Sequence, residues 1–496
     1  MFVQTQNFAS STETGVAHRT AKPTTKLNIE TLSMQTLKFH INENRGLRFI
    51  YEKMEICSAT GRKRLLSQHF ITSDFELKME LDTLEIFANF VSDRENAKSI
   101  VAIQHRLYCQ NDIHQTIHNL RSAQTLDDIE LFEVKNFCMV SRDICKLIKD
   151  TQIDILPFHD LNPVVEILDP EHNGINSFYI YSAYDEKLAT LRKEYDIAKN
   201  ANQNEKAERI RLECIEIEDR IREHLSEKLR NYSEAIQANY DQLAYLDLLL
   251  AKALLARDFK LCKPSISAND TNIKGAFNPV VAESLKERGS EFQPIDLHFD
   301  DTPNLITGAN MSGKTVVLKT MSLIQMMFQF GFFVPAESAE IAMVEEIMTS
   351  IGDAQSEVNG LSSFAIEMLN IDKILKAVKS GQKILALVDE LARTTNPSEG
   401  RALVNAFIKI LSRHATRSLI TTHYNGITAQ CNRLRVKGLQ VPEGTRVTPE
   451  NINRYMDYSL VRTTEEEVPT EGLTIAEIFG IDEEFISEAR KMINQG

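Results

Sequence analysis

The segment NLITGANMSGKT occupies residues 304–315 and joins a short apolar run to a glycine-rich loop. Its second part fits the pattern Gly-x-x-x-x-Gly-Lys-Thr. In such a loop, Gly308 and Gly313 let backbone N–H groups wrap a phosphate, and the N-terminus of the next helix adds a positive partial charge. Lys314 can reach the β- and γ-phosphates, and the Thr315 hydroxyl can bind Mg²⁺. The segment therefore predicts a strand, a phosphate-binding loop and a helix.

The residues around this loop predict an α/β domain over 273–440, because short apolar runs alternate with amphipathic ones. We expect strands at 304–307, 384–388 and 418–421, and helices at 316–330 and 400–411. Asp389 and Glu390 end the second strand; Asp389 would hold Mg²⁺ through water, and Glu390 would orient or deprotonate the attacking water. His423 follows the third strand, where it can sense the γ-phosphate.

A second turn with hydroxyl side chains lies at 359–364, just before a predicted helix. Its Ser362 and Ser363 form another helix start that is suited to an anion. Nothing nearby in the sequence requires such a feature. It is explained if these serines face a phosphate bound by another subunit.

The remaining segments are mostly helical. We expect a flexible tail at 1–27, a helical core domain at 28–180, long helices at 181–262 and a C-terminal extension with two short helices at 441–496. The long helices are predicted from an apolar stripe with charges between its members, and the polar residues 199–206 would form the tip of a helical hairpin. The polar segment 264–272 is predicted to be a linker.

Composition limits the classes of protein to which this chain can belong. The 496 residues exceed one ordinary core, and the net charge of −14 excludes a diffusely cationic nucleic-acid coat. Seven scattered cysteines without a Cys-x-x-Cys pair indicate a reducing cytoplasm. The most apolar stretches, 243–256 and 323–336, fall short of the ~20 residues that a spanning helix needs, so we expect no membrane partner.

These motifs together resemble the ATPase domain of the MutS family, the mismatch recognition proteins that belong to the ABC ATPases. The family's TGPNMGGKS loop corresponds to TGANMSGKT here, and its Gly-x-Ser-Thr-Phe-x-x-Glu signature is matched by Gly360, Ser362, Ser363, Phe364 and Glu367. The family's Asp-Glu and Thr-His-Tyr motifs are matched by Asp389 and Glu390 and by Thr422, His423 and Tyr424. The resemblance implies an α-helical core and lever domain with a shortened clamp, followed by an α/β P-loop ATPase domain of ABC type.

The resemblance also implies the cofactors and the site residues. It implies ATP with Mg²⁺ in a composite site of a homodimer that forms through the ATPase domains. Catalysis would fall to Glu390, His423 and Lys314, and Mg²⁺ to Thr315 and Asp389. Phe292 lies where the family stacks an aromatic ring on adenine. The full set expected at the nucleotide is Gly308, Asn310, Met311, Ser312, Gly313, Lys314, Thr315, Val316 and Phe292, with Ser362 and Ser363 contributed across the dimer.

Departures from the family pattern leave the partner open. No Phe here has a Glu two positions later, so we expect the Phe-x-Glu wedge of the mismatch-reading domain to be missing. One interpretation is a mismatch-repair-related ATPase that binds branched or mismatched duplex DNA. Another is an ATP-dependent remodeller of a protein partner, such as the reactivase of a cobalamin-dependent amino-acid aminomutase. A third, a non-catalytic structural dimer, conflicts with the filled catalytic positions.

Overall fold

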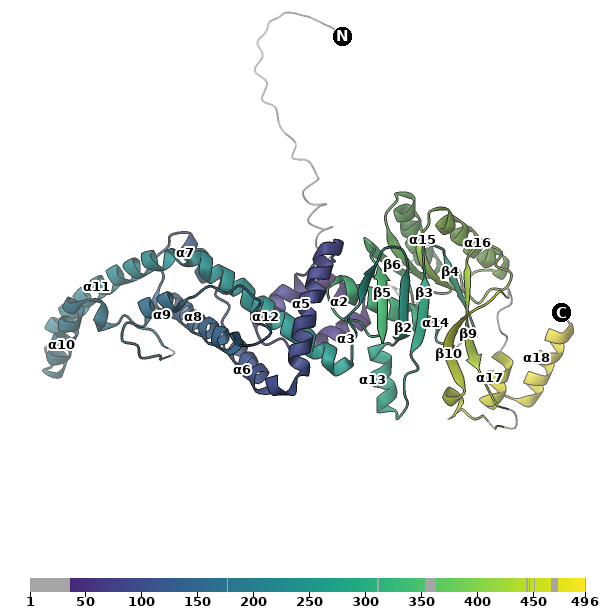
Figure 1. The fold of residues 1–496 in the computed structure, drawn as a ribbon, viewed down its shortest axis with the longest axis horizontal. Coiled ribbons are helices and arrows are strands. Elements are labelled where there is room, and N and C mark those ends of the chain that lie inside the picture. Colours follow the sequence, from purple (N-terminus) through teal and green to yellow (C-terminus); the bar gives the residue numbers. More distant parts are fainter. Residues whose placement is uncertain are drawn as a thin grey trace, which may run out of the picture.

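The computed structural model describes residues 36–175, 177–309, 312–352, 363–442, 445, 447–449, 451–464 and 472–495. The chain forms a helical part that projects as a long arm and an α/β part that contains two sheets (Figure 1). None of the described helices is both long and apolar enough to cross a lipid bilayer.

The helical part begins with short helices and ends with its two longest helices, which have 27 residues each. Its elements are α2 (Leu37–Glu43), α3 (Arg45–Lys53), α4 (Ala59–Leu66), α5 (Asp74–Ser92), η1 (Arg94–Asn96), α6 (Ala97–Tyr108), α7 (His114–Arg121), α8 (Asp128–Ile148), α9 (Asn162–Leu168), η2 (Ser182–Tyr184), α10 (Glu186–Asn200), α11 (Asn204–Arg230) and α12 (Ser233–Phe259). The predicted hairpin is confirmed, with its tip between α10 and α11. The single long stripe is divided at residues 231–232, where α11 ends and α12 begins.

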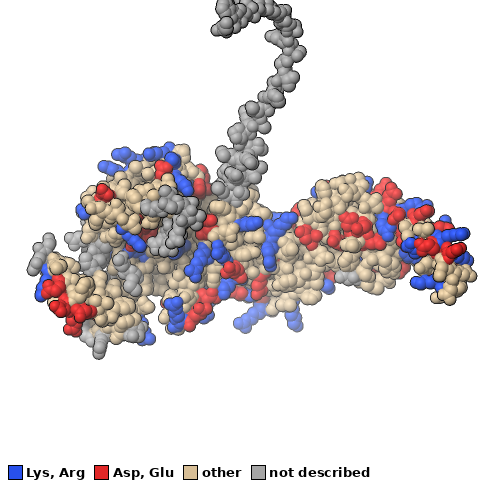
Figure 2. All heavy atoms as spheres, turned by 180° about the vertical axis from the view of Figure 1, so that it is seen from behind, with Lys and Arg blue, Asp and Glu red and all other residues tan. Residues whose placement is uncertain are grey.

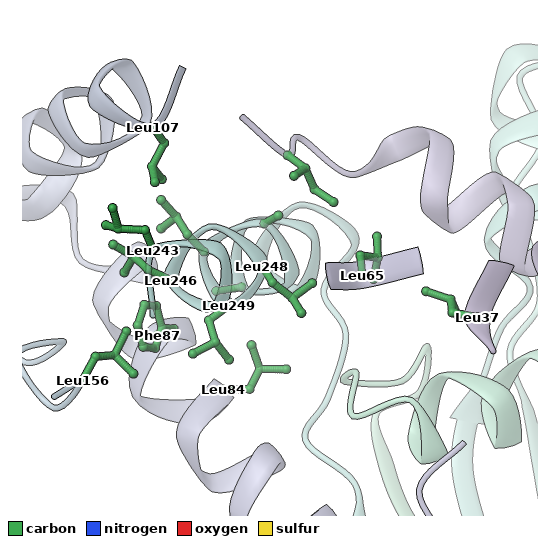
Figure 3. Packing of buried hydrophobic residues seen from close by; sticks show 14 of the residues in the cluster. Leu37, Leu65, Leu84, Phe87, Leu107, Leu156, Leu243, Leu246, Leu248 and Leu249 are labelled. Carbon is green, nitrogen blue, oxygen red and sulfur yellow. The ribbon is translucent and has the colours of Figure 1, made fainter. Parts of the chain in front are cut away.

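Helix α12 is the central element of the helical part. It is apolar around most of its circumference, which is typical of a helix surrounded by other helices. Figure 3 shows Leu84 and Phe87 of α5 beside Leu246 and Leu249 of α12, and all four side chains are fully or almost fully buried. Burying side chains of this size stabilises a fold by about 1.5–3 kcal/mol each. Helix α12 therefore holds the arm and the shorter helices in one core.

The larger sheet has six strands in the order β10-β9-β4-β8-β7-β6. These are β4 (Asn304–Thr307), β6 (Glu346–Ser350), β7 (Ile384–Val388), β8 (Arg417–Thr421), β9 (Asn432–Leu439) and β10 (Met456–Arg462). The strands are parallel except β10, which is antiparallel to β9. The strands predicted at 304–307 and 384–388 have the expected bounds, and β8 begins one residue earlier than predicted.

Helices cover both faces of this sheet. They are α14 (Lys314–Gln329) on one face, with α15 (Ser363–Lys379) and α16 (Pro397–Arg413) on the other. Alternate residues of β7 point to opposite faces: Leu385 and Leu387 pack in the core that includes α14, whereas Ile384 and Val388 pack with α15 and α16. This double burial explains the continuous apolar run in the sequence.

A second sheet has four strands in the order β1-β5-β2-β3. They are β1 (Ser265–Ser267), β2 (Thr271–Ala276), β3 (Ile295–Phe299) and β5 (Ser338–Ala342), and α13 (Pro279–Glu287) lies between β2 and β3 in the chain. The predicted linker at 264–272 is wrong, because β1 and the start of β2 occupy most of it. Its residues are polar because β1 is an edge strand that stays partly exposed.

The chain ends in η4 (Ile452–Arg454), α17 (Gly472–Ile478) and α18 (Glu483–Gln495). The last two are the short helices that the sequence predicts. They lie beyond β10, at the end of the α/β part that is farthest from the arm (Figure 1).

Candidate active site

Three predicted motifs meet at one edge of the larger sheet. Strands β4, β8 and β7 are adjacent and parallel, so their carboxyl ends lie side by side. The glycine-rich loop leaves β4, His423 follows β8, and Asp389 and Glu390 follow β7. Ligands of open α/β sheets bind at this edge. A cleft of about 600 Å³ opens here, lined by Glu43, Thr315, Thr349, Ser350, Ile351, Gly352, Ser363, Glu367, Asn370, Asp389, Glu390, Arg393 and Thr394.

Lys314 is the first residue of α14 and is buried inside the loop. Its Nζ donates to the carbonyls of Gly308 at 2.8 Å and Ala309 at 3.0 Å. The same atom lies 3.6 Å from Oε1 of Glu390. Burial lowers the pKa of Lys314, and the carboxylate of Glu390 opposes this shift. The ammonium group is thus held at the centre of the loop by oxygens that a phosphate can replace.

The two glycines of the motif are required by the shape of the loop. A Cβ on Gly308 would lie 2.8 Å from Oγ of Ser312, and a Cβ on Gly313 would lie 3.1 Å from the Tyr458 ring. Gly313 also has a φ of 84°, which other residues rarely adopt. The Ser312 hydroxyl is buried and lacks a hydrogen-bond partner among the described residues. A buried hydroxyl of this kind fits a ligand with acceptor oxygens.

Two of the predicted loop residues, Asn310 and Met311, lie outside the described residues. Val316 is half-buried in the first turn of α14, where its carbonyl accepts a hydrogen bond from Thr320 at 2.7 Å.

Asp389 connects the loop helix to the neighbouring strands. Its Oδ2 accepts a hydrogen bond from Thr315 at 2.7 Å, and its Oδ1 accepts one from Thr421 at 2.6 Å. A carboxylate beside a threonine hydroxyl is a suitable oxygen donor set for Mg²⁺, which uses one or two carboxylates together with substrate phosphates. No group of three or more acidic, His or Cys side chains suited to a metal occurs within the described ranges. The oxygens of Asp389 and Thr315 fit a Mg²⁺ ion that also binds phosphate oxygens.

Glu390 has a backbone conformation that is unusual for its residue type. Its φ is 48°, and Ala392 nearby has a φ of 63°. The Glu390 N–H donates to Oγ1 of Thr421 at 2.9 Å, which helps to hold this conformation. Non-glycine residues at positive φ cost about 1–3 kcal/mol and cluster at functional sites. The Glu390 side chain lines the cleft.

Nitrogen-bearing side chains lie around the Glu390 carboxylate. Besides Lys314, Nη1 of Arg393 lies at 3.7 Å and Nδ1 of His423 at 3.9 Å. Burial lowers the pKa of His423, and Glu390 opposes this shift. The imidazole is therefore mostly neutral at pH 7. A neutral His can donate a hydrogen bond to a phosphate without taking up a proton.

The predicted second helix start lies on the same cleft. Ser363 is the exposed first residue of α15 and lines the cleft together with Thr315 and Asp389 of its own chain. Ser362 lies outside the described residues. Glu367, one turn farther along α15, accepts a hydrogen bond from the Ala392 N–H at 2.8 Å. This bond ties α15 to the strained turn after β7.

The sequence does not single out three residues that the structure brings to the site, namely Thr421, Arg393 and Tyr458. The predicted Phe292 is half-buried between α13 and β3. The next residue, Gln293, accepts a hydrogen bond from the Tyr458 N–H at 3.0 Å. Tyr458 itself contacts the loop at Gly313, so an aromatic ring does lie beside the loop. It comes from β10, too far along the chain for any local spacing to reveal it.

The part of the chain that contains this site is similar in sequence to known proteins. Residues 304–495 match the family model described as MutS domain V. A protein named Endonuclease MutS2 from Caldicellulosiruptor bescii is 38% identical over 210 residues, covering 42% of this chain and 26% of the relative. The protein of the same name from Geobacillus sp. is 29% identical over 383 residues, covering 76% of this chain and 47% of the relative.

A third relative, named DNA mismatch repair protein MutS, comes from Lactobacillus helveticus. It is 31% identical over 277 residues, covering 55% of this chain and 31% of the relative. The matched parts of this chain thus span between about a quarter and a half of the length of these curated relatives.

The hydrogen bonds of Thr421 lead to a testable expectation for the site. Replacing Thr421 by Val keeps the shape but leaves the Glu390 N–H and one oxygen of Asp389 without their partner. We expect a loss of about 1–3 kcal/mol in the free energy of unfolding, measured by urea denaturation. The matched control is Thr428→Val on the surface, which should change stability by less than about 0.5 kcal/mol. Equal effects of the two substitutions would contradict this role of Thr421.

Proposed function

The chain belongs to the MutS family, and we propose that it is an ATPase that binds ATP with Mg²⁺ in the cleft at the carboxyl ends of β4, β7 and β8. One observation carries the proposal: the glycine-rich loop, the Thr315–Asp389 hydrogen bond and the Glu390 carboxylate meet in one cleft. We propose a P-loop ATPase domain over 273–440. The predicted helical extension at 441–496 is corrected in one respect: it also contains β10, which is a strand of the larger sheet, and its α-helices are α17 and α18. The helical core would comprise 28–180, and the levers with a shortened clamp would comprise 181–262.

The geometry supports a role for each residue of the site. The loop N–H groups and Lys314 would bind the phosphates, with Ser312 supplying its free hydroxyl. Thr315 and Asp389 would hold Mg²⁺, which supplies positive charge that offsets the charge of the phosphates. Glu390 would take the proton of the attacking water, and His423 would donate a hydrogen bond to the γ-phosphate. Tyr458 and Phe292 are the candidates for contact with the adenine ring.

Hydrolysis depends on Glu390 more than binding does. Glu390→Gln removes the base but keeps the size of the side chain, so we expect the rate of ATP hydrolysis to fall at least about a hundredfold while ATP still binds. Lys314→Ala should instead weaken ATP binding itself, because it removes the charge at the centre of the loop. Steady-state hydrolysis and calorimetric titration measure the two effects. The proposal fails if the wild-type chain neither binds nor hydrolyses ATP.

We further propose that the active form is a homodimer in which ATP is bound between two ATPase domains. Ser363 is exposed on the rim of the cleft at the start of α15, where a phosphate held by a second chain can reach it. ATP bound between the domains would draw them together, and hydrolysis would release them.

The dimer is tested by mixing two inactive chains. One carries Lys314→Ala and the other carries Ser362→Ala with Ser363→Ala. A shared site predicts that the mixture regains activity, with about one competent site per heterodimer. The two variants complement each other because each heterodimer holds one site with both halves intact: the lysine comes from one chain and the serines come from the other. Mixtures that stay inactive at every ratio would exclude the shared site.

We propose DNA as the partner of the helical part. Two of the three named relatives are called endonucleases and the third is called a mismatch repair protein, and the helical part offers a cationic hollow. Lys38, Arg62 and Lys63 line this hollow beside α4. A second hollow beside α11 is of mixed charge, because Arg220 and Lys228 line it together with Glu166 and Asp185. Figure 2, which shows the molecule from behind, has Lys and Arg side chains lying among Asp and Glu side chains over the helical part.

The mixture of acidic and basic side chains on the helical part is also compatible with a protein partner. The chain has a net charge of −14, and phosphate contacts must therefore be local. A remodeller of a protein partner remains the second candidate function for this reason.

Salt dependence distinguishes the two partners. If DNA phosphates contact the hollow beside α4, binding to a branched duplex weakens steeply with salt, and Arg62→Ala with Lys63→Ala lowers the salt slope by about 2. The matched control pair is Lys376→Ala with Lys379→Ala on α15, which should leave the slope unchanged. Fluorescence anisotropy at several salt concentrations gives the slopes. Hydrolysis that is indifferent to DNA but stimulated by a protein would favour the remodeller.

A further inference from the structure

The end of α14 that is farthest from the glycine-rich loop is enclosed by the helical part. The backbone of Ile71 exchanges two hydrogen bonds with Gln329: its N–H donates to the Gln329 carbonyl at 2.8 Å, and its carbonyl accepts from Nε2 at 2.9 Å. The ring of Phe330 packs edge-on against Phe70 and His40, with both centroid distances at 5.6 Å. Helix α14 is thus held at one end by the helical part while its other end forms the loop.

Another of these contacts comes from Lys252 of α12. Its Nζ donates to the carbonyls of Phe330 at 2.9 Å and Gly331 at 3.1 Å, just beyond the last residue of α14. A cation at this position satisfies carbonyls that the helix leaves unpaired and interacts favourably with the helix dipole. The same atom lies 3.1 Å from Oε1 of Glu80 on α5 and 4.5 Å from the centre of the Phe332 ring.

Glu80 completes the arrangement and fits closely against the end of α14. Its other oxygen accepts a hydrogen bond from the Tyr245 hydroxyl at 2.6 Å. Gly331 has a φ of 68°, and a Cβ at this position would overlap the side chain of Glu80. One buried pair of charges therefore joins three elements: α5, α12 and the end of α14.

Stability alone does not account for this pair. Lys252 is 1% exposed and lies in the apolar run Leu248–Ala256. Taking a charge out of water costs several kcal/mol, and replacing a buried pair by apolar residues of similar volume is often neutral or stabilising. The pair does, however, fix the distance and rotation between α12 and α14, which an apolar contact leaves adjustable.

We propose that Lys252 and Glu80 are positioning residues that fix α14, and with it the glycine-rich loop, to the lever helix α12. The inference rests on the proposed function, because it makes the affinity for ATP depend on how the arm is seated. Helix α14 has 16 residues and is about 24 Å long, so it carries a displacement at Phe330 to Lys314 as a nearly rigid rod. Binding of a partner to the arm then changes the affinity for ATP, and binding of ATP changes the affinity for the partner by the same factor.

The chain contains a matched control for this pair. Lys135 of α8 is also 1% exposed, lies 3.1 Å from Oδ1 of Asp169 and 5.3 Å from the centre of the Tyr181 ring. It also donates to a backbone carbonyl, that of Ser177, at 3.2 Å. This second pair has the same chemistry but contacts only the helical part.

The experiment compares Lys252→Met with Lys135→Met in the full chain. Both substitutions leave a buried carboxylate without its partner, so both should lower the melting temperature. Only Lys252→Met should raise the KM for ATP, by roughly threefold to thirtyfold, because only this pair positions the loop. The kcat should change less than the KM does, because Glu390 and His423 lie on other elements and Lys314 acts mainly by binding the phosphates. A double variant, Lys252→Met with Glu80→Gln, removes the unpaired charge and guards against loss of folding.

The outcomes separate the inference from the proposed function. The inference holds if the double variant regains much of the melting temperature but keeps the raised KM. It is overturned if Lys252→Met and Lys135→Met have the same KM, or if the KM of the double variant returns to the wild-type value as its stability recovers. A wild-type chain that neither binds nor hydrolyses ATP would instead defeat the proposed function, and the inference with it.

Discussion

The packing of α14 between the six-stranded sheet and the N-terminal helices is the constraint on which the rest of the structure depends. The helix begins in the glycine-rich loop, and its middle packs against the sheet through residues such as Leu318 and Met321. Its far end is enclosed by the helical part. The buried residues of the arm, of α14 and of one sheet face consequently form a single continuous hydrophobic cluster. A continuous core of this kind favours transmission of strain over independent movement of the two parts.

The active-site edge combines strong local order with stored strain. Asp389 and Glu390 are consecutive, yet they lie in different conformations: Asp389 is fixed by two threonine hydroxyls, and Glu390 follows at positive φ. The Tyr424 hydroxyl donates to the carbonyl of Ala392 at 2.6 Å, so the residue after His423 also stabilises this turn. The turn after β7 is therefore held from β8 and from α15, which couples the acidic residues to the helix that begins at Ser363.

The sequence predicts the centre of this site well because the relevant chemistry is local. Lys314 and Thr315 are placed by a loop of fixed length, and Asp389 is placed by an apolar strand whose end is easily recognised. Parallel strands then bring these ends together without further information. The strand bounds at 304–307 and 384–388 are confirmed. The second strand is an uninterrupted apolar run because it is buried on both faces, and the first is marked by the glycine-rich loop that follows it.

Other features depend on contacts that local patterns do not encode. The smaller sheet is missed because its edge strand β1 is polar and short. Tyr458 reaches the glycine-rich loop only because β10 pairs with β9, which in turn pairs with β4. The Lys252–Glu80 pair is equally hidden, since a lone lysine in an apolar helix gives no indication of which backbone carbonyls it will reach. Such features follow from tertiary packing, which a single sequence specifies only collectively.

The length of the arm has a mechanical consequence. Helices α11 and α12 have 27 residues each, so together they measure about 80 Å along their axes, and Figure 1 shows them running one after the other away from the sheets. Over such a radius, each degree of rotation at the root of α12 displaces the tip near α10 by about 1.4 Å. The displacement of the tip for a given rotation at the root therefore grows in proportion to the length of the two helices.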